Sequence, residues 1–369
     1  MAACNTSVCL NLRSLDLRSR YPYPVQITYT LGLRSATRIG RERTISEPHY
    51  VIYGAGGIGG TIGARMFQSG NRVTLIARGD HGKQLRDEGM QFITPGEHNL
   101  LRIPTVLDPS EVNFDANTFV LMCMKSQHSL VALEALAACA PADVRVACVQ
   151  NGVANERTAI RFFANTYATV VNVPAVFLKP GEIVTHAEGT GGGLDTGCFP
   201  HGSDDAAAQL TSALTDSGFS AIPDPAVMRQ KYAKLLLNLG NILHAGLTDP
   251  GDVQAITHEL RHEALACFEA AGIDCASREE ARQRTKDVRS AEVPGYERVA
   301  GSSWQSVARG TGDIETEYLN GEICWLGRMH AIATPYNNAC VQMARALIAR
   351  NEGPGLYSAA EFGASIEVK

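Results

Sequence analysis

Three glycines in this chain have the spacing of a phosphate-binding turn. Gly54, Gly56 and Gly59 follow a short apolar run, residues 50–53, and precede a helical pattern over residues 58–69. Between a strand and a helix, such glycines permit a tight turn, a close backbone approach to a pyrophosphate and close helix–strand packing. The helix start adds unpaired N–H groups and a positive dipole end. The pattern favours a dinucleotide site over an ordinary glycine-rich turn. The expected contacts are Gly54, Ala55, Gly56, Gly57, Ile58 and Gly59.

The residue after the next predicted strand, 73–77, indicates which dinucleotide the turn would hold. A site for NAD usually has Asp or Glu at this point, bonded to the ribose hydroxyls. This chain has Arg78 there, and a guanidinium suits the additional 2′-phosphate of NADP. Asp80 leaves NAD as the alternative. We therefore expect NADPH as the cofactor.

Two further polar residues follow later predicted strands. Lys125 comes after residues 119–124, and Asn151 comes after residues 144–150. In an open α/β sheet, ligands lie outside the carboxyl ends of the strands. We expect Lys125 and Asn151 beside the nicotinamide and its substrate; the alternative is a solvated loop lysine and a plain Asn-Gly turn.

A predicted helix over residues 228–247 carries polar residues along one side. At about 100° per residue, Asn238 lies roughly 40° from Lys234 and Asn241 roughly 20° to the other side. The rest of the helix is largely apolar and suited to burial. Burying an ammonium and two amides costs several kcal/mol unless they have partners. A ligand pocket would supply such partners, whereas the alternative is a stripe that faces solvent.

The elements that position these residues divide the chain into three parts. Residues 48–222 alternate short apolar strands with helices, which indicates a parallel sheet covered on both faces. The rhythm becomes β-rich between about 168 and 200. After Pro223 the chain is predominantly helical, at 228–247, 255–272, 302–330 and 336–350. The predicted fold is α/β: an N-terminal Rossmann-type dinucleotide-binding domain at 48–222, followed by an all-α C-terminal domain at 223–369.

Residues 1–47 differ from the rest of the chain. They carry seven arginines and only three acidic residues. This composition fits either a mitochondrial-type transit segment or a disordered extension. Pro22 and Pro24 would interrupt a long amphipathic helix there.

Composition excludes several classes of protein. A net charge of −5 argues against a nucleic-acid partner, which would require a clustered basic surface. No apolar run approaches the roughly 20 residues that span a bilayer, so we expect no membrane partner. The ten cysteines form no C-x-x-C pair, and we expect no metal site. We expect a cytoplasmic protein, or a mitochondrial one if residues 1–47 are a transit segment.

Several short motifs, in one order along residues 50–350, resemble those of the ketopantoate reductase (2-dehydropantoate 2-reductase) family. They are Gly54–Gly59, Arg78-Gly79, Lys125, Gln150-Asn151-Gly152, Ala175 with Pro180-Gly181, Lys234 with Asn238, Ser302-Ser303, Glu315 before Tyr318-Leu-Asn-Gly321, Thr334-Pro335 and Asn337. The resemblance implies NADPH-dependent reduction of a 2-oxo acid to a 2-hydroxy acid, in a cleft between the two domains. A homodimer is one assembly compatible with it.

The resemblance also implies roles for individual residues. Lys234 resembles the general acid that protonates the developing alkoxide. Glu315 resembles a carboxylate that positions cofactor and lysine, and Glu317 is its nearby rival. Ala175 matches a cofactor contact, as do Arg78 and Lys125. The implied substrate ligands are Asn151, Asn238, Asn241 and Ser303.

Two departures from the family pattern concern the substrate. The family usually has a second asparagine eight residues after the lysine, where this chain has Ile242, one residue after Asn241. Trp304 is bulkier than expected beside Ser303. A related reductase acting on another oxo acid or a ketone is therefore one alternative. A non-catalytic NADP-binding sensor is another. His81, His128 and His244 have no arrangement typical of a triad or metal site, and we expect structural or surface roles for them.

Overall fold

The computed structural model describes residues 47–249, 253–296, 301–310, 312 and 314–366. The predicted extension at 1–47 lies outside these residues, apart from Glu47. Contacts divide the chain into two compact units, Met1–Ile45 and Ser46–Lys369, and the second is described here. Within it, we call residues 48–222 the sheet half and residues 223–366 the helical half.

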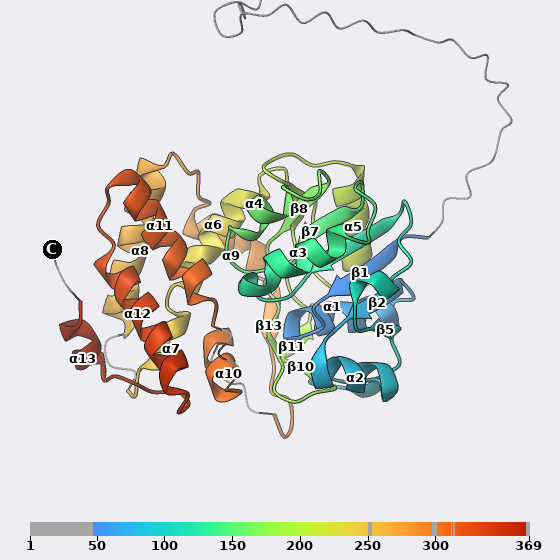
Figure 1. Ribbon diagram of the computed structural model, residues 1–369, viewed down its shortest axis with the longest axis horizontal. Helices are drawn as coiled ribbons and strands as arrows, with labels where there is room; N and C mark the ends of the chain where they lie inside the picture. Colours follow the sequence, from blue (N-terminus) through green and yellow to red (C-terminus); the bar gives the residue numbers. More distant parts are fainter. Residues whose placement is uncertain (1–46, 250–252, 297–300, 311, 313, 367–369) are drawn as a thin grey trace, which may run out of the picture. The chain divides into compact units, whose positions relative to one another are not determined.

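A seven-stranded sheet forms the centre of the sheet half (Figure 1). Its order is β12-β8-β7-β6-β1-β2-β5, and the strands are parallel except β12, which is antiparallel to β8. The chain crosses from one side of β1 to the other between β5 and β6, so β1 and β6 meet at a topological switch point, where ligands bind in such sheets. The strands are β1 (His49–Tyr53), β2 (Arg72–Ile76), β5 (Thr105–Val106), β6 (Thr118–Met122), β7 (Arg145–Cys148), β8 (Thr166–Thr169) and β12 (Thr196–Cys198).

Helices cover both faces of this sheet. Tyr50 and Ile52 of β1 are buried against apolar residues of α1 and α5, whereas Val51 and Tyr53 are buried against those of α3 and α4. Side chains alternate between the faces of a strand, so a strand buried on both faces is apolar throughout. The predicted Rossmann-type arrangement is confirmed. The helices of the sheet half are α1 (Gly57–Gln68), α2 (Gly79–Asp87), α3 (Ser129–Ala137), α4 (Asn155–Ala159) and α5 (Asp205–Asp216).

A second, smaller sheet packs against α1. Its order is β4-β3-β10-β9, from β3 (Met90–Ile93), β4 (His98–Leu101), β9 (Ala175–Val176) and β10 (Glu182–Thr185). A Cβ added to Gly60 of α1 would lie only 2.7 Å from Ile183 Cγ1 of β10, so the glycine permits this close packing. The β-rich segment expected between about 168 and 200 is divided among three sheets: β8 and β12 belong to the main sheet, β9 and β10 to the smaller one, and β11 (Ala187–Gly189) to a third, two-stranded sheet.

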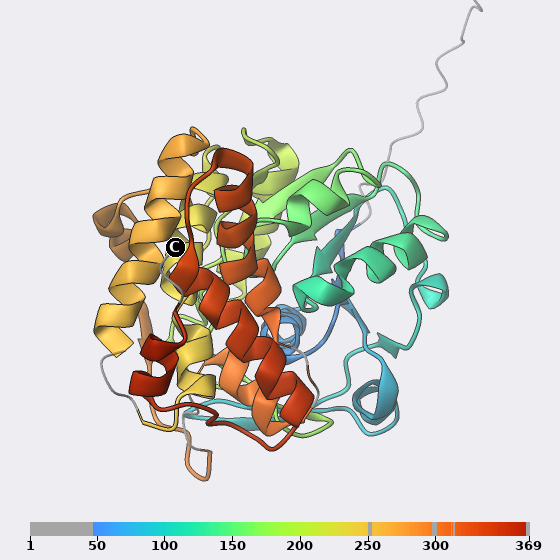
Figure 2. The ribbon, with the colours of Figure 1, turned by 60° about the vertical axis from the view of Figure 1, so that its left-hand side comes forward.

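The helical half has its own apolar core, in which α8, α11 and α12 pack against one another (Figures 1 and 2). Leu260 of α8, Ile323 of α11 and Leu347 of α12 are all buried there. The helices are α6 (Val227–Asn238), α7 (Asn241–Gly246), α8 (Val253–Ala270), α9 (Arg278–Thr285), α10 (Ser302–Ala308), α11 (Asn320–His330), α12 (Pro335–Arg350) and α13 (Ala359–Ala364).

The helical half differs from the prediction in three places. The helical pattern expected over residues 302–330 forms two separate helices, since α10 ends at Ala308 and α11 begins at Asn320. The single helix expected at 228–247 is two helices, α6 and α7, separated by Leu239 and Gly240. Gly240 permits a close approach of α8, because a Cβ there would lie 3.2 Å from Thr257 Oγ1. The half is also not entirely α-helical. Its strand β13 (Val288–Ser290) pairs antiparallel with β11 (Ala187–Gly189) of the sheet half.

Candidate active site

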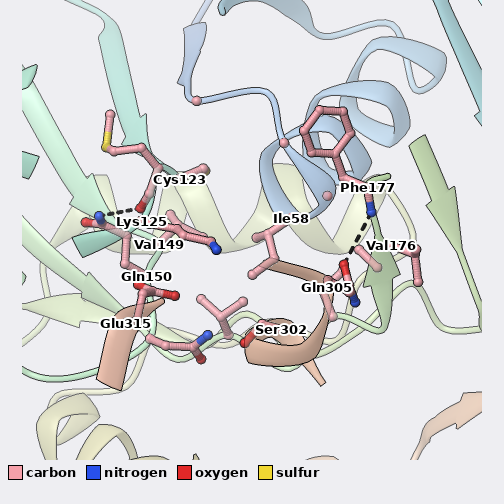
Figure 3. A pocket seen from close by; sticks show the side chains of 18 of the residues that line it. Ile58, Cys123, Lys125, Val149, Gln150, Val176, Phe177, Ser302, Gln305 and Glu315 are labelled. Carbon is pink, nitrogen blue, oxygen red and sulfur yellow. Dashed lines mark hydrogen bonds between the residues drawn. The ribbon is translucent and has the colours of Figure 1, made fainter. Parts of the chain in front are cut away.

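A cavity of about 970 Å³ lies between the glycine turn, the ends of β6 and β7, and helices α6, α7 and α10. Its volume is in the range of pockets that hold small molecules and cofactors. In Figure 3, Glu315, Ser302 and Gln305 of the helical half lie opposite Ile58 and Phe177 of the sheet half. The predicted site residues that line it are Gly54, Ala55, Gly56, Gly57, Ile58, Arg78, Lys125, Asn151, Ala175, Lys234, Asn238, Asn241 and Glu315.

The glycine turn has the geometry that a phosphate cradle requires. Gly54 has φ +99°, and a Cβ on it would lie 2.7 Å from Met124 N. A Cβ on Gly59 would lie 2.2 Å from Gly54 O, so Gly59 serves helix–strand packing and does not line the cavity. Gly56, by contrast, lines the cavity, and a Cβ on it would meet only Phe177 Cδ1 within 4 Å, at a contact distance of 3.9 Å. No side chain caps the start of α1. Its first N–H groups are thus available for an anion.

The end of β2 presents Arg78 to the cavity and turns Asp80 away from it. Arg78 is exposed and lines the cavity. The Asp80 side chain is 89% exposed and lies 3.6 Å from Lys83 Nζ. His81, expected to be structural or at the surface, joins two loops. Its Nδ1 accepts from Gly181 N at 2.9 Å, so its Nε2 carries the proton and donates to Ala55 O at 2.7 Å. Burial lowers the pKa of His81, which favours this neutral form.

Lys234 and Asn238 reach the cavity from the last turns of α6. Lys234 Nζ donates to Asn172 Oδ1 at 2.7 Å, and burial lowers the pKa of Lys234 to about 8. Asn238 Nδ2 donates to Asn151 Oδ1 at 3.1 Å. Asn241 begins α7 and also lines the cavity. The predicted polar stripe is therefore brought together across a break between two helices and not along one helix.

Lys231, one turn before Lys234, holds α6 in place. Its Nζ lies 2.6 Å from Glu156 Oε1, and both side chains are almost fully buried. The same Nζ donates to Gln150 O at 2.9 Å and Thr169 O at 3.2 Å, at the ends of β7 and β8. Sequence reasoning missed this residue, although a lysine on an apolar helix was a visible signal.

Lys125 and Glu315 join the two halves at the cavity wall. Lys125 Nζ donates to Ser306 Oγ of α10. Glu315 is buried, and its Oε1 accepts from both Ser126 N and Ser126 Oγ at 3.0 Å. Glu317 lies elsewhere, in an exposed pair with Arg345 at 2.7 Å. Glu315 is thus the glutamate that meets the residues following β6.

Three residues near the substrate end lie differently from what the sequence suggests. Ser303 is buried and does not line the cavity, whereas its neighbour Ser302 does. Ile242 is 1% exposed and belongs to the core of the helical half. Trp304 packs on the same core. Neither bulky residue lines the cavity, so neither narrows the substrate end directly.

The charged groups of the lining are predominantly cationic. Among the described residues, the charged lining groups are four cations (Arg78, Lys125, Lys234, Arg309) and one carboxylate (Glu315). Sequence reasoning missed Asn172, Gln305 and Arg309, because nothing in the local pattern places them beside the turn. Such a lining suits a ligand with several negative charges, although the net charge of the chain is −5.

Neither a metal cluster nor a membrane span is found within the described part of the chain. No three His, Cys, Asp or Glu residues there gather into a set that could bind a metal ion. Of the helices that were described, none combines the length and apolarity needed to cross a bilayer.

Known proteins share this organisation. The chain is 23% identical to the 2-dehydropantoate 2-reductase of Lactococcus lactis over 305 residues, 79% of this chain and 95% of the relative. A PanE/ApbA family ketopantoate reductase from Ralstonia eutropha has the same fold, with TM-score 0.67 and 24% identity over 82% of this chain and 99% of that one. So does D-mandelate dehydrogenase in its ternary structure with NADH and anilino(oxo)acetate, with TM-score 0.69 and 23% identity over the same shares.

Each half of the chain matches a part of one protein family. The family described as "Ketopantoate reductase PanE/ApbA" matches residues 50–200, and its C-terminal part, "Ketopantoate reductase PanE/ApbA C terminal", matches residues 226–348. The first match contains the glycine turn, and the second contains Lys234 and Glu315. This chain therefore belongs to the ketopantoate reductase family of oxidoreductases.

Proposed function

We propose that this protein reduces a 2-oxo acid to a 2-hydroxy acid with NADPH, that ketopantoate is the substrate, and that Lys234 is the general acid. The reaction adds a hydride to the carbonyl carbon and a proton to its oxygen. The observation that carries the proposal is that Lys234 and the glycine turn line the same cavity.

The residues of the cavity fit a dinucleotide. The lack of a side chain at Gly56, the uncapped start of α1 and the cations in the lining together suit a pyrophosphate. When bound, NADPH supplies the hydride. Arg78 would meet the 2′-phosphate, since it lines the cavity while Asp80 pairs with Lys83 outside it. This arrangement supports NADPH over NADH.

Lys234 has the properties that a general acid needs. With a pKa of about 8 it is mainly an ammonium at neutral pH, yet it gives up its proton more readily than an exposed lysine. Asn172 fixes the ammonium by accepting one of its hydrogen bonds. The positive charge would stabilise the developing alkoxide before the proton moves, and the partly buried setting strengthens that attraction.

Three side-chain amides and one hydroxyl group in the cavity could bind the substrate. Asn151, Asn238, Asn241 and Ser302 line the same cavity as Lys234, which suits a 2-oxo acid that carries a hydroxyl group, as ketopantoate does. The name of the Lactococcus lactis relative supports the same substrate. A different 2-oxo acid is the alternative, because Ile242 lies in the core at the position of the family's second asparagine.

Turnover with a substrate panel tests the proposal. Purified protein and NADPH should lose reduced-nicotinamide absorbance when ketopantoate is added. Trimethylpyruvate differs from ketopantoate only by lacking the hydroxyl, and we expect its kcat/KM to be at least about tenfold lower. Lys234→Ala should lower kcat by about a hundredfold or more. Equal rates with both acids would favour the alternative substrate, and no turnover with any 2-oxo acid would refute the proposal.

A further inference from the structure

Arg309, directly after α10, reaches from the helical half to the loop that covers the glycine turn. Its Nη1 donates to Phe177 O, and its guanidinium carbon lies 5.2 Å from the centroid of the Phe177 ring. Gln305 Oε1, one turn earlier, accepts from Phe177 N at 3.5 Å. The contact between Gln305 and Phe177 is drawn in Figure 3. Two side chains of the helical half thus hold the backbone of one residue of the sheet half.

Phe177 in turn lies against the glycine turn. Its Cδ1 would be 3.9 Å from a Cβ on Gly56, and its ring lies 4.4 Å from the His81 ring. His81 is bonded to Ala55 O, inside the turn. Arg309 and Phe177 both line the cavity. The guanidinium therefore lies beside the aromatic ring that borders Gly56, in the same cavity that the glycine turn lines.

We propose that Arg309 is a cofactor-binding residue that contacts the pyrophosphate of a dinucleotide held on the glycine turn. The inference rests on the proposed function, since it takes the ligand of the turn to be a nicotinamide dinucleotide. A guanidinium binds phosphate oxygens through a planar array of donors, and that bond is charge-assisted. Arg78 serves the opposite end of the same ligand, at the 2′-phosphate. The cofactor therefore touches both halves of the protein, through Arg309 on one side and Gly56 on the other.

Direct binding measurements with four ligands distinguish the roles of Arg309 and Arg78. NADPH, NADH and ADP-ribose all carry the pyrophosphate, whereas 2′-AMP carries only the other phosphate. Arg309→Ala should weaken binding of the first three about tenfold to a hundredfold, with the NADPH-to-NADH ratio unchanged. It should leave the Kd of 2′-AMP as in the wild type. Arg78→Ala should show the reverse pattern: it should weaken the binding of NADPH and 2′-AMP but not the binding of NADH or ADP-ribose.

Two further variants test whether the effect is specific to Arg309 and whether it depends on the positive charge. Arg289→Ala removes an exposed arginine of β13 that does not line the cavity, and it should change no Kd. Arg309→Lys keeps the charge and should recover part of the ADP-ribose affinity. If Arg309→Ala does not fold, Arg309→Lys is compared with the wild type in its place, and its ADP-ribose binding should still be weaker. The inference is overturned if Arg309→Ala binds ADP-ribose like the wild type, or if it weakens 2′-AMP equally, which would mean that Arg309 only holds Phe177. Tight ADP-ribose binding that depends on Arg309, without turnover of any 2-oxo acid, would refute the proposed function alone.

Discussion

Lys234 shows how the surroundings of one side chain set the conditions under which it can work. Its apolar helix removes it from water, and this burial lowers its pKa to about 8. Its hydrogen bond to Asn172 uses the ammonium as donor. A general acid must carry its proton when the substrate binds, so the protonated form is the active one.

Activity should therefore fall with rising pH. We expect kcat/KM for ketopantoate to be flat below pH about 8 and to drop tenfold per pH unit above it, since that ratio reports ionisations of the free enzyme. Initial rates between neutral pH and pH about 10 would measure this. Lys234→Arg is the matched control, because its guanidinium keeps the charge but cannot give up a proton; it should be nearly inactive throughout. A profile without any decline in that range would contradict the role of Lys234.

Most of the predicted site residues line the cavity, and short local patterns were enough to find them. The glycine turn, Arg78, Lys125 and Asn151 each follow a strand, and strand ends meet at one edge of a parallel sheet. Ser303 shows where this reasoning ends. Neighbouring residues on a helix point about 100° apart, so the orientation of α10 about its axis decides that Ser302 and not Ser303 faces the cavity. That orientation is set by packing on the helical core and has no local signal.

Helices and strands could be predicted where a local sequence pattern indicates them. They could not be predicted where they form only through contact with a segment far away in the sequence. Short apolar runs predicted the strands of the main sheet. Strand β13 has only three residues and exists because β11, about a hundred residues earlier, pairs with it. The break between α6 and α7 lies at Gly240, where α8 approaches so closely that a Cβ would be 3.2 Å from Thr257 Oγ1. Both features involve tertiary contacts that a single stretch of sequence does not contain.

The position of α6 depends on the buried pair of Lys231 and Glu156. We expect Lys231→Met to lower the free energy of unfolding by about 3–5 kcal/mol, because it leaves a carboxylate buried without its partner. Urea denaturation would measure the loss. Adding Glu156→Leu should restore roughly half of it or more, since apolar residues often replace a buried ion pair at little cost. If the double variant were less stable than Lys231→Met alone, the unpaired carboxylate would not be the cause.

At the scale of the whole molecule, several of the contacts that join the two halves lie at the site itself. Glu315 meets Ser126, Lys125 meets Ser306, and Arg309 meets Phe177, each pair crossing from one half to the other. Arg284 of α9 also pairs with Asp195 of the sheet half. A ligand that contacts both sides of the cavity should therefore stabilise both halves together.

The two tryptophans allow this coupling to be measured, because Trp304 and Trp325 both belong to the helical half, whereas the glycine turn belongs to the sheet half. With NADPH at a hundred times its Kd, we expect the unfolding transition seen by tryptophan fluorescence to gain about 2.7 kcal/mol, as mass action predicts for a ligand that binds only the folded state. The far-UV circular dichroism transition should move by the same amount. Adenosine, which lacks every phosphate, is the control and should move neither transition at the same concentration. If NADPH moved the circular dichroism transition but left the tryptophan transition in place, the halves would unfold independently and the cofactor would not join them.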